Sequence, residues 1–239
     1  MTVIAILKTG STLPAVRQQH GDFEHWFREK LGNQVATQVI DVAAGDSPGK
    51  PEDWDGIVVT GSPAMVTDRE PWSEATAHWL RHAVERETPL LGVCYGHQLL
   101  ADALGGEVSN RPQGRESGTF EVSLRAETSD DPLFRQLPKR FRAHLTHQQS
   151  VIRLPSAARL LAASSAEAHQ AFRVGPCAWG VQFHPEFTAD VMRAYLDAQA
   201  PALATAGQRV NELKKGVRDT PYANHLLLAF SSFVRWRHG

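Results

Sequence analysis

The sequence predicts an α/β fold in which a mixed, mostly parallel central sheet is flanked by helices. Short apolar runs alternate with amphipathic segments of helical length through the first hundred residues, which indicates β-α-β units. Short β-rich segments follow over about 106–187, and the remaining pattern is helical. Because no internal repeat, low-complexity tract or linker interrupts the chain, we expect a single domain over 1–239. Its core spans about 1–187, and a helical C-terminal tail spans 188–239.

The strands expected in the first hundred residues are apolar runs bounded by turn residues. The first run, VIAIL, is continuous, as expected for a strand buried on both faces. The predicted strands span 3–7, 34–42, 55–62 and 89–94.

Helices are expected over 16–32, 70–88 and 95–106. The pair Gly21–Asp22 divides the first helix, with Asp22 capping its second piece and Gly32 ending it. The second helix has apolar side chains close to helical spacing, and the third is closed by glycine.

The β-rich region predicts an antiparallel extension of the same sheet, with turns at Pro138, Pro155 and Gly175. Its expected strands span 120–125, 141–152, 159–165, 169–175 and 178–187. The helical tail is interrupted at Pro201, Gly207 and 216–221.

Composition narrows the classes of function. The chain is 42% hydrophobic with a net charge of −1 and no basic run, which argues against a dedicated nucleic-acid binder. Its two cysteines form no Cys-x-x-Cys pair, so we expect a reduced, cytoplasmic protein rather than a disulfide-stabilised one. The N-terminus does not read as a signal peptide, and no apolar stretch approaches the length of a membrane helix, so no membrane association is expected.

The segment GVCYG, residues 92–96, matches the pattern of a tight strand-to-helix turn that presents a nucleophile, here Cys94. Flanking glycines are needed there because bulky neighbours would clash with the nucleophile's backbone. The helix N-terminus favours a thiolate, and the amide of Tyr95 is free to donate to an oxyanion. Free cysteines are more often small buried hydrophobic residues, so the turn alone leaves two interpretations open.

A nucleophilic cysteine needs a base, and the nearby histidines are weak candidates. His97 lies only three residues after Cys94, but no carboxylate is placed to orient it. His78 and His82 share a helix face with Glu74, a row that could hold a metal, although a solvated polar face explains it better.

The segment WGVQFHPEF offers a better base. In an extended segment His184 and Glu186 project to the same side, and Pro185 biases His184 toward that geometry. A carboxylate beside an imidazole fixes its tautomer and stabilises the imidazolium. A surface His-x-Glu at a strand end is the alternative interpretation.

A glycine at the end of the third predicted strand completes this set. Gly61 lies at the carboxyl end of that strand, where ligands bind in parallel sheets. Without a side chain, its N–H can closely approach an anionic oxygen. Taken alone, the Gly-Ser-Pro sequence predicts only a turn.

In this order and at these separations, GVCYGHQLLA, VVTGSPAMV and WGVQFHPEF resemble motifs of the class I glutamine amidotransferases. The resemblance is closest to the amidotransferase domain of GMP synthase and its stand-alone relatives, and it implies a flavodoxin-like fold. Two further segments, THQQSVIRLP at 146–155 and GRESG at 114–118, look like that family's Ser-His-x-Asp-x-Val and Gly-Arg-Glu-x-Gly.

The resemblance implies a thioester mechanism that needs no cofactor or metal. Cys94 would attack the glutamine side-chain amide, His184 would transfer protons, and Glu186 would hold His184. The amides of Gly61 and Tyr95 would receive the oxyanion, and water would release glutamate.

The resemblance also implies substrate-binding residues. Gln98 would help to hold the substrate, and Thr146 and His147 would lie near its α-amino and α-carboxylate groups. Gln149 stands where the family carries an aspartate, so we expect the amino-acid end of the substrate to be bound differently.

The leading hypothesis is a glutaminase-type hydrolase that delivers ammonia to a separate synthetase, because the phosphate-loop motif Ser-Gly-Gly-x-Asp-Ser of GMP synthase does not occur. A γ-glutamyl peptidase acting on other γ-glutamyl amides is the runner-up, since only the leaving amine differs. A binding module without catalysis is the third hypothesis.

Overall fold

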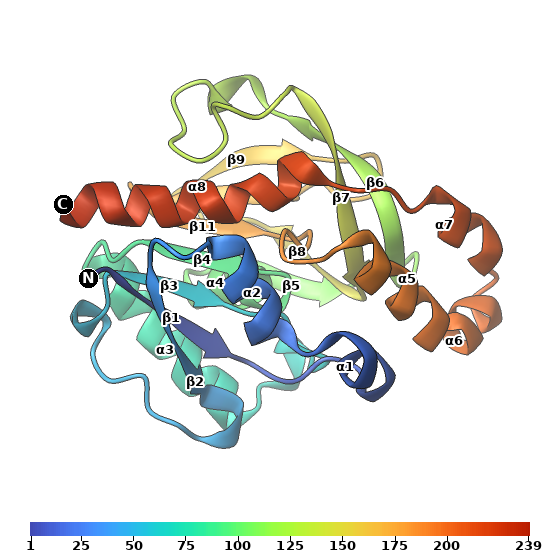
Figure 1. Cartoon of the computed structure of the whole chain (residues 1–239), viewed down its shortest axis with the longest axis horizontal. Coiled ribbons are helices and arrows are strands. Elements are labelled where there is room, and N and C mark those ends of the chain that lie inside the picture. Colours follow the sequence, from blue (N-terminus) through green and yellow to red (C-terminus); the bar gives the residue numbers. More distant parts are fainter.

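The central sheet combines a parallel half with an antiparallel half (Figure 1). In the computed structural model, which describes residues 1–239 apart from the side chain of Glu127, this sheet has nine strands. They are β1 (Val3–Lys8), β2 (Ala36–Asp41), β3 (Gly56–Val59), β4 (Leu90–Val93), β6 (Glu116–Leu124), β7 (Arg140–His147), β9 (Ala158–Ala163), β10 (Ala171–Val174) and β11 (Ala178–Val181).

The strand order is β2-β1-β3-β4-β11-β10-β9-β6-β7. The first five strands in this order pair in parallel, and every later pair is antiparallel. This arrangement confirms the mixed sheet that the sequence predicts, including an antiparallel extension built from its second half.

Helices cover both faces of the sheet. They are α1 (Pro14–His20), α2 (Phe23–Leu31), α3 (Pro71–Glu85), α4 (Tyr95–Ala103), α5 (Ala189–Ala198), α6 (Ala200–Thr205), α7 (Val210–Gly216) and α8 (Pro221–His238). Short 3₁₀ turns lie at Val42–Ala44, Pro51–Asp53, Val66–Asp68 and Ala126–Thr128. One buried cluster joins the sheet to α1, α2, α5 and α8, and a second joins the opposite face to α3 and α4.

The predicted break between the first two helices is confirmed. Asp22 caps α2 by accepting a hydrogen bond from the Phe23 amide, and its side chain also accepts from the Thr12 amide. Gly21 and Gly32 both adopt positive φ angles of 81°, which glycine tolerates. The capped turn therefore ties the loop after β1 to the start of α2.

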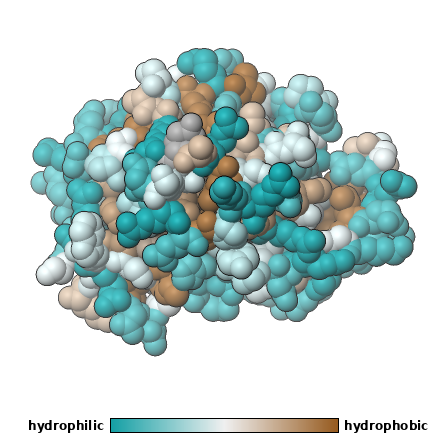
Figure 2. Space-filling view, turned by 90° about the horizontal axis from the view of Figure 1, so that it is seen from above, coloured by the Kyte–Doolittle hydropathy of each residue, from teal (hydrophilic) through white to brown (hydrophobic). Residues whose placement is uncertain are grey.

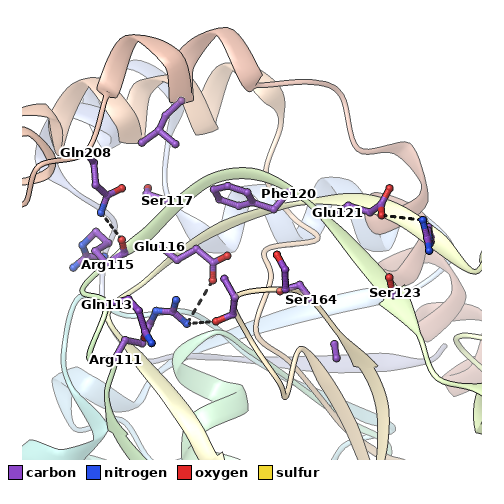
Figure 3. Close-up of a pocket in the computed structure, with 15 residues that line it drawn as sticks. Arg111, Gln113, Arg115, Glu116, Ser117, Phe120, Glu121, Ser123, Ser164 and Gln208 are labelled. Atoms are coloured by element: carbon purple, nitrogen blue, oxygen red, sulfur yellow. Dashed lines mark hydrogen bonds and ion pairs between the residues drawn. The ribbon is translucent and has the colours of Figure 1, made fainter.

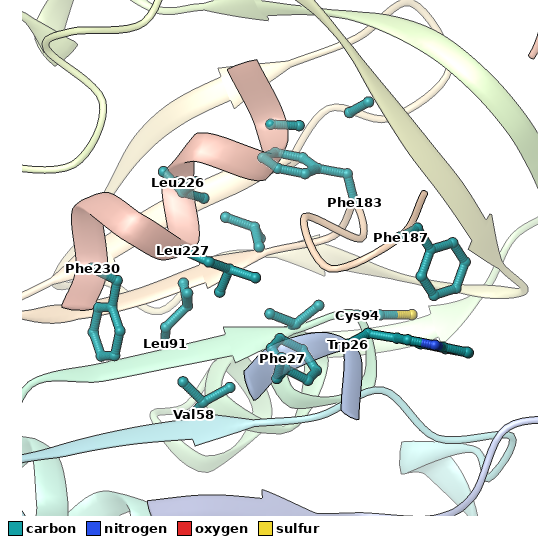
Figure 4. Packing of buried hydrophobic residues seen from close by; sticks show 14 of the residues in the cluster. Trp26, Phe27, Val58, Leu91, Cys94, Phe183, Phe187, Leu226, Leu227 and Phe230 are labelled. Atoms are coloured by element: carbon teal, nitrogen blue, oxygen red, sulfur yellow. The ribbon is translucent and has the colours of Figure 1, made fainter. Parts of the chain in front are cut away.

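The tail ends in a helix that belongs to the core. Leu226, Leu227 and Phe230 of α8 are fully buried and face the sheet, where they lie close to Leu91 and Val58 (Figure 4). Burying such side chains contributes roughly 1.5–3 kcal/mol each, so α8 is an integral part of this face.

Two strands depart from the predicted extension. The 141–152 segment divides, and its second half becomes β8 (Gln149–Arg153), which pairs with β5 (Glu107–Asn110) in a separate two-stranded sheet. The reason is packing, because Val108 and Val151 are buried in the cluster that covers α4. The last predicted strand, β11, belongs to both halves, because it pairs antiparallel with β10 and also pairs in parallel with β4.

The position of β11 matters most for the site. Its register pairs Gly180 with Gly92 and Val181 with Val93, so both strands end at the same level of the sheet. The segments that follow, with His184 and Cys94, therefore meet at one edge.

The face of the molecule seen in Figure 2 is mainly polar. Figure 2 shows hydrophilic residues over most of one face, with apolar residues in small groups among them. No helix in the described part of the chain has the length and apolar character that a membrane span requires.

Candidate active site

Cys94 occupies a sharp turn between β4 and α4. Its φ and ψ angles are 51° and −101°, a conformation that costs a non-glycine residue roughly 1–3 kcal/mol. Two backbone hydrogen bonds hold the turn, from the Cys94 amide to Val181 O (2.9 Å) and from the Gln98 amide to Cys94 O (3.0 Å). The sulfur points away from Leu91 (Figure 4) and lies 3.8 Å from Thr146 O. These hydrogen bonds therefore hold Cys94 in a strained backbone conformation that presents its thiol.

The flanking glycines are required by the backbone around them. A Cβ on Gly92 would lie 2.5 Å from Gly96 O, and one on Gly96 would lie 2.5 Å from Val59 O in β3. The added Cβ atoms would therefore clash with the first turn of α4 and with the neighbouring strand β3. The sequence pattern instead predicts a clash with the backbone of Cys94 itself. Only glycine lets α4 start this close to the sheet.

The imidazole of His184 is held by a carboxylate, as the sequence predicts. Its Nδ1 lies 2.7 Å from Glu186 Oε1, and both side chains are buried. The predicted extended geometry is wrong, because β11 ends at Val181 and Pro185 and Glu186 form a turn. The turn, rather than strand alternation, folds the carboxylate back onto the ring. Phe187 stacks on the imidazole with centroids 4.1 Å apart.

The electrostatics of His184 favour an imidazolium. Burial lowers the pKa of His184, but the charges of Glu186 and of a Cys94 thiolate outweigh it and raise the pKa to about 10. Its Nε2 has no hydrogen-bond partner within the described chain, while Nδ1 is engaged by Glu186. The free nitrogen is the one available for proton transfer in the cavity shared with Cys94.

Among the described residues, the two backbone amides that the sequence predicts as oxyanion donors, those of Gly61 and Tyr95, are free of protein acceptors. The Thr60–Gly61 peptide is held by Thr9, whose Oγ1 donates to Thr60 O at 2.9 Å. A Cβ on Gly61 would lie 3.1 Å from the ring of His184, so this amide lies beside the imidazole. The side chain of Tyr95 is directed elsewhere, because its hydroxyl pairs with Ser73 in α3.

Cys94 and His184 open into a small cavity of about 70 Å³. Its remaining lining comes from the loops after β1 and β3, from Arg115 and Thr146, and from the tail. These residues are Ser11, Thr12, Leu13, Phe23, Ser62, Pro63, Arg115, Thr146, Tyr195 and Gln199. Most of them are polar, so the cavity suits a polar ligand.

The three predicted substrate-binding residues are placed differently from one another. Thr146 lines the cavity. Gln98 does not, and its Nε2 donates to Gln149 O (2.8 Å) and Gln182 Oε1 (3.0 Å). His147 lies outside as well, between Glu116 Oε2 and Gln149 O, both at 2.8 Å. Gln98 and His147 thus hold the segment that carries Thr146.

The three histidines that the sequence offers as weaker candidates, His97, His78 and His82, have structural explanations for their positions. His97 packs on Phe172 with centroids 5.0 Å apart, and burial lowers the pKa of His97 to about 3, so the ring is neutral. His78 and His82 are exposed and contact each other at 3.1 Å. Across the described side chains, no group of three or more His, Cys, Asp or Glu residues could hold a metal ion.

Several lining residues have no predicted role. Arg115 belongs to the quoted GRESG segment, but spacing alone does not assign it to this cavity. Tyr195 and Gln199 come from the tail, where the sequence has no motif. The hydroxyl of Tyr195 is hydrogen-bonded to that of Thr12, which also lines the cavity. Only the packing of α5 against α1 reveals their position.

Comparison with known proteins identifies the family. The family model described as glutamine amidotransferase class-I matches residues 22–199, which include every motif quoted above. The chain belongs to this family.

Its relatives within the family differ in length. The chain is 32% identical over 169 residues to the glutamine-hydrolyzing GMP synthase of Aeropyrum pernix, covering 68% of this chain but 31% of that protein. It is 30% identical over 172 residues to a glutamine-hydrolyzing GMP synthase subunit of Halobacterium salinarum, covering 72% and 87%. It is also 26% identical over 189 residues to gamma-glutamyl peptidase 4 of Arabidopsis thaliana, covering 76% and 74%.

Solved structures support the same fold. A glutamine amidotransferase from Thermotoga maritima superposes with a TM-score of 0.77 at 23% identity, covering 98% of each chain. The similarity in fold between this amidotransferase-family chain and that structure therefore includes the C-terminal helices.

Proposed function

We infer that this chain hydrolyses the side-chain amide of glutamine to glutamate and ammonia through a thioester on Cys94. The observation that carries the inference is the buried His184–Glu186 pair, which shares a cavity with a cysteine presented on a strained turn. Membership of the amidotransferase family supports the same chemistry.

In the acylation half, His184 Nε2 takes the proton of the Cys94 thiol, and the sulfur attacks the amide carbon. The carbonyl oxygen becomes an oxyanion that accepts hydrogen bonds from the Gly61 and Tyr95 amides. When the intermediate collapses, the C–N bond breaks and the imidazolium donates its proton to the departing ammonia.

In the deacylation half, neutral His184 removes a proton from water, which attacks the thioester. The C–S bond breaks, glutamate leaves, and the proton on His184 returns to the Cys94 sulfur. Glu186 stabilises the imidazolium in both halves without accepting the proton itself.

Substrate binding is assigned by position in the cavity. We propose that Thr146 contacts the amino-acid end of the substrate. Gln98 and His147 act through the Thr146–Gln149 segment, because their side chains are used within the protein.

The proposed partner is a separate synthetase protein that consumes the ammonia. The relative from Halobacterium salinarum, which is named as one subunit of GMP synthase, supports this proposal.

A second candidate is hydrolysis of γ-glutamyl peptides by the same thioester chemistry. The observation in its favour is a larger cavity of about 690 Å³ (Figure 3), whose lining includes Arg115, a residue that also lines the 70 Å³ cavity. A bulky leaving amine would have space there. The similarity to gamma-glutamyl peptidase 4 supports this candidate.

The test measures release of glutamate from glutamine and from γ-glutamyl dipeptides. Turnover of glutamine that falls about 10³-fold or more in Cys94→Ala, with unchanged melting, supports the leading proposal. Turnover of the dipeptides alone supports the second candidate. Activity that survives Cys94→Ala would show that the nucleophile is wrong, and no turnover of any substrate would favour an inert module.

A further inference from the structure

Arg111 and Arg115 both lie in the link between β5 and β6, but they differ in their ion pairs. Arg111 is buried and paired, since its Nη1 lies 3.1 Å from Glu167 Oε2 and 3.6 Å from Glu116 Oε2. Arg115 has no carboxylate within ion-pair distance among the described residues. Its guanidinium donates instead to Gln148 Oε1 at 3.3 Å.

The unpaired arginine faces the reacting atoms. Arg115 lines the cavity that contains Cys94 and His184. Burial lowers the pKa of Arg115, and the proximity of Cys94 and Tyr195 partly offsets that effect. A cation that is partly withdrawn from water without an anion is unfavourable unless a ligand supplies the anion.

The rest of the lining makes Arg115 distinctive. Apart from Cys94, His184 and Tyr195, the other residues that the structure places around this cavity carry no ionisable side chain. His184 is committed to Glu186, so Arg115 is the one cation in this lining that is free to pair with an anion. A guanidinium binds a carboxylate with two parallel hydrogen bonds, which gives both orientation and strength.

We propose that Arg115 binds a carboxylate of the substrate and so determines its specificity, an inference that rests on the proposed function. The carboxylate has two available sources. One is the α-carboxylate of the γ-glutamyl group. The other is a carboxylate on the leaving amine, which would extend into the larger cavity that Arg115 also lines.

Substitution of Arg115 leaves its backbone contact in place. Gln208 Nε2, in the link between α6 and α7, donates to the Arg115 carbonyl at 2.7 Å (Figure 3). Arg115→Gln removes the charge, and Arg115→Lys keeps it. Arg140→Gln is the matched control, because Arg140 is exposed, lines only the larger cavity, and pairs with Glu121.

The experiment uses two substrate pairs with each variant. Glutamine and its α-amide differ at the α-carboxylate, and γ-glutamylglycine and γ-glutamyl methylamide differ at the leaving amine. We expect Arg115→Gln to lower the preference for the carboxylate member of one pair by on the order of 10- to 100-fold, mainly through KM. Arg115→Lys retains part of that preference, and Arg140→Gln retains all of it.

The pair that loses its preference identifies the source of the carboxylate. Preferences equal to those of the wild type in both pairs would overturn the proposal, as would an equal loss on all four substrates.

Failure of the proposed function is distinguishable from failure of this inference. If the wild type turns over none of the four substrates, calorimetric binding of glutamate and γ-glutamylglycine tests Arg115 alone. Weaker binding of either by Arg115→Gln supports the inference, and equal binding of both contradicts it.

Discussion

The Nδ1 atom of His184 lies 2.7 Å from Oε1 of Glu186, and the pair is buried beside the turn that carries Cys94. The contact leaves Nε2 as the nitrogen free to exchange a proton in the cavity. Because the carboxylate also favours the imidazolium, this relationship controls the pH range in which the proposed thiolate–imidazolium pair persists.

Glu186→Gln is expected to lower activity and to shift its pH profile. The charge of Glu186 is the largest effect that raises the pKa of His184, so the neutral amide lowers that pKa from about 10. The alkaline limb of kcat/KM should move to lower pH by about 1 unit or more. The rate at neutral pH should fall about 10²-fold or more, because the imidazole loses its orienting carboxylate. An unchanged alkaline limb in glutamate release would contradict this role.

Thr9→Val is expected to lower kcat by about 10-fold with little change in KM. Thr9 Oγ1 holds the Thr60 carbonyl, and the Gly61 amide belongs to the same peptide group. Losing that contact loosens one proposed oxyanion donor without removing it. Thr9→Ser keeps the hydroxyl and should restore the rate. Steady-state kinetics of both variants test this, and an equal loss of activity in Thr9→Ser would show that the hydroxyl is not the cause.

Gly96→Ala is expected to lower the free energy of unfolding by about 1–3 kcal/mol or more. Its Cβ would lie 2.5 Å from Val59 O, so α4 or β3 must shift. Gly216→Ala is the matched control, because nothing lies within 4 Å of the added Cβ, and it should change stability by less than about 0.5 kcal/mol. Denaturant unfolding measures both, and equal stability of the two variants would refute the packing argument.

Asp22→Ala is expected to destabilise the protein by about 2–4 kcal/mol at neutral pH, because it removes a helix cap and leaves Lys8 with one fewer partner. Burial raises the pKa of Asp22, but hydrogen bonds from the Thr12 and Phe23 amides and the charge of Lys8 outweigh it and bring the pKa below 3.8. A depressed pKa contributes stability above 3.8, and that contribution is lost as the pH falls through the lowered value. Unfolding curves should therefore converge for wild type and variant in acid. A constant difference down to about pH 2 would argue against the carboxylate.

Local chemistry made much of this fold and site predictable. Apolar runs predict β1, β3 and β4, the Gly21–Asp22 pair predicts the helix break, and the glycines around Cys94 predict the turn. Each of these features depends mainly on neighbouring residues. The pairing of His184 with Glu186 also follows from the sequence, although a turn brings them together in place of the expected strand.

Features set by long-range packing were not predictable. The separation of β8 from β7 depends on the surface of α4 that β5 and β8 cover. Gln98 and His147 match a family pattern, but hydrogen bonds to Gln149 and Glu116 turn them away from the cavity. Arg115 is in a recognisable segment, yet only the fold shows that it faces Cys94 while Arg111 does not.

Covalent labelling tests the central claim, that Cys94 is the nucleophile, most directly. An electrophilic ketone analogue of glutamine is mixed with the folded chain, and the modified residue is located by peptide mass spectrometry. Cys177 is the internal control, because it is buried outside the cavity and burial raises the pKa of Cys177 to about 11. We predict one label per chain on Cys94, slowed by glutamine and accompanied by loss of activity. Labelling of Cys177 alone, or an unlabelled Cys94 in the folded chain, would contradict the account.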